Sequence, residues 1–201
     1  MSDARQYDGP TLPHYLQPGL RAVIIGNNPA IFSAEAGHYY ARPGNVFWRH
    51  LSASGIAGRE VGPADDVRLL DEAGIGFCDL CCRPTVRADE LTEDEIREGS
   101  MRLLADLQTM SPVYAVFSSR GIYQQFGHHA LGLPAASLSK RAYGAQPERI
   151  VGVGGETIPY VIPSSSGLAS KWHRERLELL HELNTLLPSV NAWRSSRDDE
   201  Q

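Results

Sequence analysis

Two amide side chains follow an apolar, β-branched run of the kind that forms a buried strand. Asn27 and Asn28 come directly after residues 23–26, and Pro29 follows them. Ligands of open α/β sheets bind where strands end, so both amides lie at the expected mouth of a site. Pro29 disfavours the helical region for Asn28 and thereby restricts the direction of its side chain. A neutral amide accepts a hydrogen bond from water but is a poor proton acceptor, so its chemistry is positioning.

Aromatic side chains crowd the segment that follows this turn. Within residues 37–48 they are Tyr39, Tyr40, Phe47 and Trp48. Asn45 is placed to cap a helix that runs from residue 46 to about residue 53. Taken alone, the turn and the aromatics favour an ordinary strand-to-loop connection beside a core aromatic cluster.

The elements that must position these residues alternate between strands and helices. Thr92 and Glu95 form a capping box that opens one helix, and Pro112 ends it. Residues 152–155 are glycine-rich but precede a strand, so they predict a hairpin or loop rather than a dinucleotide site. Further strands are expected at 74–80, 113–119 and 157–162, and further helices at 67–73, 120–129 and 171–187. This alternation predicts a three-layer α/β/α sandwich with a mainly parallel central sheet.

The composition fits one globular domain. The chain has 201 residues, of which 42% are hydrophobic. We expect a single domain at 19–189, an irregular lead-in at 1–18 and a polar tail at 190–201 that frays from residue 194. No stretch is apolar enough to cross a bilayer, and the first residues do not begin a signal peptide. A cytoplasmic protein without a membrane partner is therefore expected, nucleoid-associated in a bacterium or nuclear in a eukaryote.

Cysteine usage and charge narrow the class further. Cys78, Cys81 and Cys82 form an odd, clustered set without a fourth thiol, so buried free thiols are expected and a metal site is not. The formal net charge of -5 argues against a general DNA coat protein but allows a local basic patch. Candidates for that patch are Arg42, Arg49, Lys140, Arg141, Lys171, His173 and Arg174.

Three pieces of the chain, within about residues 20–187, resemble the mismatch-specific uracil/thymine-DNA glycosylases of the uracil-DNA glycosylase superfamily. The first is the turn at 26–29 together with the segment from Tyr40 to Trp48. The second is Pro163-Ser164-Ser165-Ser166-Gly167-Leu168, and the third is residues 83–85 with the preceding strand. The resemblance implies a uracil-DNA glycosylase-like fold and a monomeric, monofunctional enzyme that needs no metal or organic cofactor.

The implied reaction is hydrolysis of the N-glycosidic bond of uracil, notably in G:U mismatches, at the start of base excision repair. Thymine, ethenocytosine and deaminated purines are further candidate substrates. The implied partner is double-stranded DNA whose damaged or mispaired base is flipped out of the stack, at a cost of a few kcal/mol.

The resemblance also implies roles for single residues. Asn28 matches the catalytic asparagine that aims water at C1′ of the sugar. Tyr40 sits at the base-stacking position, and Ser33 lines the pyrimidine pocket. Asn45 falls near the flipped nucleotide, although helix capping explains it equally well. Backbone N–H groups from Asn27 to Ile31 are expected to stabilise the negative charge of the leaving base.

Three positions depart from the family pattern. Asp79 stands where related enzymes carry lysine or asparagine, and its carboxylate could act as a general base beside Asn28. The alternative for Asp79 is a structural carboxylate, paired with Arg83 or solvated. Ala30 replaces the usual glycine and would narrow the pocket floor, whereas Asn27 replaces an apolar residue and would alter base selectivity.

The late serine segment is similar to the loop that enters DNA in this family. Leu168 matches the wedge that fills the gap left by the flipped base, and Gly167 precedes it. Ser164, Ser165 and Ser166 could hold phosphates, and Lys171 at the start of the last helix would add to that grip. The alternative is a loop with one packed leucine.

Two other functions fit the same residues. The first is a catalytically silent reader of damaged or single-stranded DNA that binds bases in the same pocket. The second is a nucleoside N-glycosidase, which the predicted wedge disfavours because a free nucleoside needs no unstacking.

Overall fold

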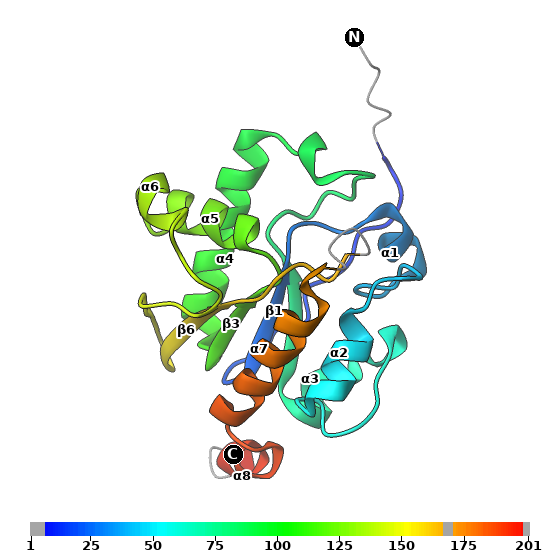
Figure 1. Ribbon diagram of the computed structural model, residues 1–201, viewed down its shortest axis with the longest axis vertical. Coiled ribbons are helices and arrows are strands. Elements are labelled where there is room, and N and C mark those ends of the chain that lie inside the picture. The colour runs from blue at the N-terminus through cyan, green and yellow to red at the C-terminus, as the bar shows by residue number, and fades with distance from the viewer. Residues whose placement is uncertain (1–6, 167–170, 199–201) are drawn as a thin grey trace.

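The computed structural model describes residues 7–166 and 171–198, which build a sheet covered by helices on both faces (Figure 1). Along the sheet the strand order is β2-β1-β3-β6-β4, and β5 pairs with β6 outside this path. The first four strands in this order are parallel, whereas β4 and β5 run antiparallel to β6. The strands are β1 (Ala22–Gly26), β2 (Ile75–Asp79), β3 (Tyr114–Phe117), β4 (Gly144–Ala145), β5 (Ile150–Gly152) and β6 (Gly155–Val161).

The helices form the two outer layers. Those described are α1 (Ile31–Ala36), α2 (Phe47–Ser54), α3 (Arg68–Ala73), α4 (Glu93–Met110), α5 (Arg120–His129), α6 (Ala135–Leu138), α7 (His173–Leu186) and α8 (Val190–Asp198), with 3₁₀ turns at Pro63–Asp65 and Ala88–Glu90. Alternate residues of β1 enter different cores, because successive side chains of a strand point to opposite faces. Ala22 and Ile24 join the core under α2, α3 and α7, while Val23 and Ile25 join the core under α4, α5 and α6. The predicted α/β fold is confirmed.

Local sequence signals place several elements correctly. Thr92 and Glu95 form the predicted reciprocal capping box at the start of α4. The predicted helix at 120–129 is α5, and the glycines at 152–155 close the β5–β6 hairpin. Among the described residues, no helix has both the length and the apolar character needed to span a membrane.

Two predictions fail on tertiary contacts. The segment expected to be a polar tail contains α8, because Trp193 is 5% exposed and its indole N–H donates to the carbonyl of Gly19 at 2.8 Å. Cys78 and Cys81 are buried as predicted, but Cys82 is exposed.

The parallel strands point their carboxyl ends away from α8, which lies at the bottom of Figure 1. Residues of the candidate site follow those carboxyl ends.

Candidate active site

Asn28 lies in the turn that follows β1, and its amide nitrogen already donates to protein acceptors. The Nδ2 atom lies 2.9 Å from the carbonyl oxygen of Arg83 and 2.7 Å from Thr85 Oγ1. The Asn27 amide donates in turn to Asn28 Oδ1 at 3.2 Å. A carboxamide oxygen has two lone pairs, so Oδ1 keeps one for a further donor. The side chain is therefore oriented to accept a hydrogen bond from a water molecule.

The turn itself is held by a ladder of backbone hydrogen bonds between the segments that leave β1 and β2. The N–H of Leu80 donates to the carbonyl of Gly26 at 2.9 Å, and the N–H of Cys81 donates to the carbonyl of Asn27 at 2.8 Å. The N–H of Thr85 donates to the carbonyl of Pro29 at 3.2 Å. The segments that follow β1 and β2 thus remain hydrogen-bonded to each other beyond the sheet. The backbone around Asn28 is therefore fixed by the segment that follows β2.

Asp79 is the last residue of β2 and stands directly opposite Gly26 in the register. Its side chain is 4% exposed and lies across the Cα of Gly26: a Cβ at that position would stand 2.0 Å from Asp79 Oδ1. Only glycine leaves room for the carboxyl group there. Within the described residues, the carboxyl oxygens of Asp79 form no hydrogen bond or ion pair.

Burial raises the pKa of Asp79 to about 7, and the Arg102 guanidinium opposes that rise. Arg102 donates to the backbone carbonyls of Asp79 and Leu80, at 2.7 and 2.8 Å. The predicted alternative of an Asp79–Arg83 pair is wrong, because Arg83 is bound to Glu95 with an Nε–Oε1 distance of 2.6 Å. Asp79 is left as a carboxyl group that changes protonation near neutral pH.

Tyr40 adopts a left-handed backbone conformation, with φ of 53°. Such conformations cost energy for a non-glycine residue and cluster at functional sites. The half-buried ring stacks on Phe47, with centroids 4.1 Å apart and an interplanar angle of 23°. Only the other face of the Tyr40 ring can receive a base.

The Tyr40 hydroxyl is buried near the carboxyl group of Asp79 and the side chain of Ser118. Burial, and then the Asp79 carboxyl group, raise the pKa of Tyr40 above its usual range. Among the described residues, this hydroxyl has no hydrogen-bond partner of good geometry. A buried polar group of this kind marks a place for an ordered water or for a ligand atom.

Ser33 and Asn45 support the aromatic segment through their side chains. Ser33 Oγ accepts a hydrogen bond from the N–H of Ala41 at 3.3 Å and so holds the residue after Tyr40. Asn45 Oδ1 accepts from the N–H of Phe47 at 2.9 Å, but the N-cap residue of α2 is Val46, so Asn45 lies one residue before the capping position predicted for it. Both residues shape the segment that carries Tyr40.

The expected row of free backbone donors is shorter than predicted. The N–H of Ile31 donates to the carbonyl of Thr85 at 3.3 Å, so it is not available to a leaving base. Pro29 has no N–H to donate. The N–H groups of Asn28 and Ala30 have no acceptor within the described residues. These two amides flank Pro29 at the mouth of the site.

The serine segment follows β6 and is held from behind by α7. The buried side chain of Arg176 donates from Nε to the carbonyl of Pro163 at 2.9 Å, and it also donates to the carbonyl of Ser164. The N–H of Val46 donates to the carbonyl of Ser165 at 3.3 Å, which ties the segment to the start of α2. Ser166 donates its N–H to Ser164 Oγ at 3.3 Å. The predicted residues Gly167 and Leu168 lie outside the described residues.

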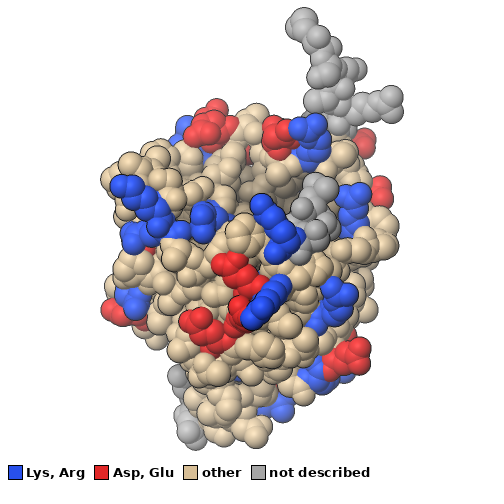
Figure 2. All heavy atoms as spheres, viewed as in Figure 1, with Lys and Arg blue, Asp and Glu red and all other residues tan. Residues whose placement is uncertain are grey.

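Two of the seven residues of the predicted basic patch are paired with acidic side chains. Arg141 pairs with Glu148, and Arg174 pairs with Glu178 at 2.8 Å. Lys171 has no acidic partner in the part of the chain that the structure describes, and its Nζ lies 5.1 Å from the ring centroid of Trp172. Figure 2 shows basic side chains over the upper part of the face on which α7 begins. Arg42, Arg49 and Lys140 likewise have no acidic partner among the described residues, so most of the predicted patch keeps its positive charge.

Comparison with known proteins agrees with this arrangement. The family model of the uracil DNA glycosylase superfamily matches residues 13–187. The chain belongs to the uracil-DNA glycosylase superfamily. A solution structure of a candidate uracil DNA glycosylase from Methanosarcina acetivorans has the same fold, with a TM-score of 0.53 and 20% sequence identity. That match covers 87% of this chain and 97% of the archaeal one.

Membership of the superfamily makes the chain an N-glycosylase, a hydrolase with DNA as its substrate class. It suggests uracil-DNA glycosylase activity in base excision repair. The turn at Asn28 and the serine segment lie at the same edge of the sheet, after β1 and β6. The hydrogen bond from Val46 to Ser165 links the serine segment to the aromatic segment that carries Tyr40.

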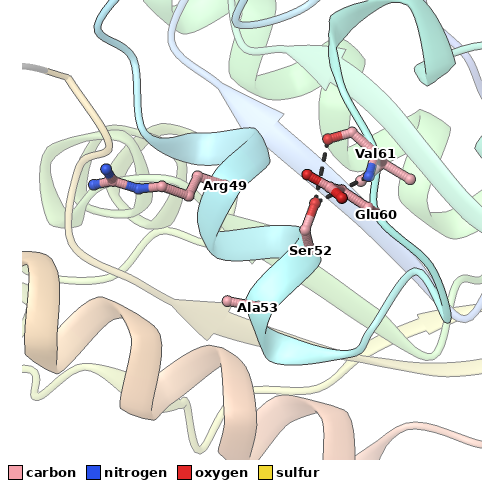
Figure 3. A pocket seen from close by; sticks show the side chains of 5 residues that line it. All are labelled: Arg49, Ser52, Ala53, Glu60 and Val61. Atoms are coloured by element: carbon pink, nitrogen blue, oxygen red, sulfur yellow. Dashed lines mark hydrogen bonds between the residues drawn. The ribbon is translucent and has the colours of Figure 1, made fainter.

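A hollow elsewhere on the surface has no comparable chemistry. Its volume is about 530 Å³, and Figure 3 shows its lining residues, Arg49, Ser52, Ala53, Glu60 and Val61. The Ser52 hydroxyl is already bonded to the backbone N–H and carbonyl of Val61, at 3.0 and 3.2 Å. No strand end of the sheet contributes to this lining.

Sequence reasoning missed three residues that position the site. Thr85 orients the Asn28 amide, and Arg102 donates to the backbone carbonyl of Asp79. Arg176 donates to the backbone of the serine segment. Thr85 lies within the family-like segment at residues 83–85, so the sequence carries a signal for it. Arg102 and Arg176 lie on helices among many charged residues, and only the fold shows that their guanidinium groups point inward.

Proposed function

We propose that this superfamily member is a monofunctional, mismatch-specific uracil-DNA glycosylase that acts on uracil in duplex DNA, notably opposite guanine. The observation that carries the proposal is the orientation of Asn28. Its amide nitrogen donates to the carbonyl of Arg83 and to the hydroxyl of Thr85, so the amide oxygen is the atom left to bind a water molecule. A fixed acceptor at the end of a buried strand suits a hydrolase that must aim one water molecule.

In the proposed reaction, water held by Asn28 Oδ1 attacks C1′ of the flipped nucleotide. The bond from C1′ to the base nitrogen breaks, and its electron pair leaves with the base. A sugar with oxocarbenium character needs only a weakly activated nucleophile, so a neutral amide suffices to position the water. The N–H groups of Asn28 and Ala30 would stabilise the anionic base, as donors in an oxyanion hole do.

Asp79 would accept the proton that the attacking water loses. A general base works best when its pKa lies near the operating pH, and burial raises the pKa of Asp79 to about 7. At neutral pH a substantial fraction of the carboxyl groups is ionised and can take the proton. The absence of an ion pair to Asp79 within the described residues leaves its oxygens available for this step.

Tyr40 would receive the flipped base on the ring face opposite Phe47. Stacking of a base on an aromatic side chain contributes about 1–3 kcal/mol. Ser33 and Asn45 would act mainly by holding the segment that carries Tyr40, and Asn27 and Ala30 would border the base. Ser164, Ser165 and Ser166 would hold the DNA backbone, with Leu168 as the wedge.

The test is a panel of duplex oligonucleotides, each with one altered base opposite each normal base. We expect abasic sites, revealed by alkaline strand cleavage, to form fastest with uracil opposite guanine and to exceed the enzyme concentration. Asn28→Ala is the matched control for contaminating activity. Equal cleavage by both proteins would contradict the proposal, and stoichiometric binding without product would indicate a silent reader. Release of uracil from free deoxyuridine at the duplex rate would indicate a nucleoside N-glycosidase.

A further inference from the structure

Two aromatic rings in contact, with a cation over each, form a short row beside the candidate site. The Arg120 guanidinium carbon lies 4.4 Å from the ring centroid of Tyr143. The Tyr143 and Trp172 rings meet edge to face, with centroids 5.8 Å apart, and Lys171 Nζ lies 5.1 Å from the Trp172 centroid. We call Arg120, Tyr143, Trp172 and Lys171 the cation–aromatic row. Its members come from the start of α5, the segment before β4 and the residues that lead into α7.

The two cations of the row have no acidic partner among the described residues, whereas seven other arginines each pair with a carboxylate. Within the described residues, Arg120 and Lys171 form no ion pair and no hydrogen bond. Arg120 Nε is buried and lacks an acceptor in the same set of residues. By contrast, the nearby Arg141 pairs with Glu148. The row therefore keeps positive charge and donors for a ligand.

The row lies along the edge that carries the site. Arg120 begins α5 two residues after Ser118, whose backbone N–H donates to the carbonyl of Ile25 at 2.9 Å. Ile25 and Gly26 lead directly into the Asn28 turn. At its other end the row meets α7, from which Arg176 holds the serine segment. A strand of DNA that enters the site would pass this row.

We propose that the cation–aromatic row binds one single strand of DNA beside the target nucleotide. Arg120 and Lys171 take phosphates, and the half-exposed ring of Trp172 stacks an unpaired neighbouring base. Aromatic rings flanked by basic side chains suit this ligand, because stacking tolerates any base and the cations bind the phosphates of the backbone. Tyr143 holds the Arg120 guanidinium by a cation–π contact and so orients its donors. This proposal rests on the proposed function for its biological setting, since that function brings DNA to this edge.

Its test needs no glycosylase activity. The probe is a lesion-free single strand of about twelve thymidines, a length within the reach of such sites. Of the three tryptophans, Trp48 and Trp193 are each 5% exposed and Trp172 is half-buried. We expect the probe to quench tryptophan fluorescence, and we expect Trp172→Phe to lose most of that quenching. Quenching that survives in Trp172→Phe would overturn the proposal.

The second readout is the dependence of affinity on salt. We expect Arg120→Ala and Lys171→Ala each to weaken binding about fivefold and to reduce the slope of log affinity against log salt by about 0.7, the value for one phosphate of a single strand. Arg120→Lys should keep the slope, because it keeps the charge. Thermal unfolding of each variant shows whether the fold is intact, and exposed Lys171 reports on the row without a packing role.

Arg197→Ala is the matched control, since Arg197 lies over Trp193 at 5.2 Å on α8, at the opposite end of the molecule. Its binding and salt slope should equal those of the wild type. An unchanged slope in Arg120→Ala and Lys171→Ala, or an equal change in Arg197→Ala, would contradict the proposal. Equal quenching of Trp172 by polyglutamate would do the same, because the row would then be a general anion surface. A protein without glycosylase activity that still passes both readouts would refute only the proposed function.

Discussion

The two halves of the candidate site are held in different ways. The Asn28 turn is fixed by backbone hydrogen bonds from the segment that follows β2, and by the Arg83 carbonyl and Thr85 hydroxyl. The serine segment is held instead by Arg176, a fully buried side chain from α7, and by the N–H of Val46. The first half is thus local to two neighbouring strands, whereas the second depends on how two helices pack.

This difference separates the two tasks that a base-removing enzyme must perform. Chemistry tolerates little displacement, because a misplaced reactive group loses rate steeply. A turn tied to the strand next to it moves only with the sheet. DNA binding tolerates adjustment, and a segment held by Arg176 on α7 and by the N–H of Val46 before α2 can shift as these two helices move. We therefore expect changes in the first half to lower the rate of base removal, and changes in the second to weaken DNA binding.

The largest effect is expected for Asn28→Ala. Removal of a fixed polar group from a preorganised site lowers the rate about 10²- to 10³-fold. We expect that loss in single-turnover cleavage of a G:U duplex, with affinity for an abasic duplex changed less than threefold. A comparable loss of affinity for the abasic duplex would mean that the Asn28 turn serves DNA binding. The two halves of the site would then not differ in task.

Asp79→Asn comes next, with a loss of about 10²-fold, the lower end for general base catalysis. The wild-type rate should rise with pH and level off above about pH 7, where the Asp79 carboxyl group is ionised. The rate of Asp79→Asn should be flat through the same range. A wild-type profile that stays flat from pH 5 to 9 would return Asp79 to a structural role.

The same variant should be more stable than the wild type at alkaline pH. Burial raises the pKa of Asp79 from 3.8 to about 7, so the folded state binds the proton more tightly than the unfolded state does. Wild-type stability should then fall as pH rises from 4 to 7, by at most roughly 4 kcal/mol, and stay lower above that range. Denaturant unfolding of both proteins at pH 4 and pH 8 measures the gap, which should open only at pH 8.

Arg176→Lys tests the second half. The shorter ammonium cannot serve both carbonyls of the serine segment, and a buried acceptor left without its donor costs about 1–3 kcal/mol. We expect KM for duplex DNA to rise about tenfold while kcat changes less than threefold. Denaturant unfolding provides the control for global loss of structure. A fall in kcat with an unchanged KM would show that the serine segment positions the reacting atoms instead.

The smallest effect is expected for Thr85→Val, which removes the hydroxyl 2.7 Å from the Asn28 amide and keeps the shape of the side chain. The Arg83 carbonyl still accepts from the same amide, so the Asn28 oxygen should remain roughly aimed. Loss of one hydrogen bond, worth about 1 kcal/mol, predicts a single-turnover rate about fivefold lower. Thr85→Ser, which restores the hydroxyl, should recover most of that rate.

Sequence reasoning succeeded where the determinant is local. The strand before Asn28, the Thr92–Glu95 capping box and the glycine-rich hairpin at 152–155 each follow from a few adjacent residues. It failed where a single side chain finds a distant partner: Trp193 turns an apparently polar tail into α8 through the Gly19 carbonyl. The candidate site divides in the same way, because Asn28 and Tyr40 stood out in the sequence whereas the inward direction of Arg176 depends on the packing of α7.

The most direct test of the account is the structure of the protein bound to a G:U duplex that carries a cleavage-resistant 2′-fluoro-deoxyuridine. The account predicts a uracil turned out of the helix onto the open face of Tyr40, with a water bridging Asn28 Oδ1 and C1′. A uracil that stays paired in the duplex, or one held away from Asn28, would contradict it.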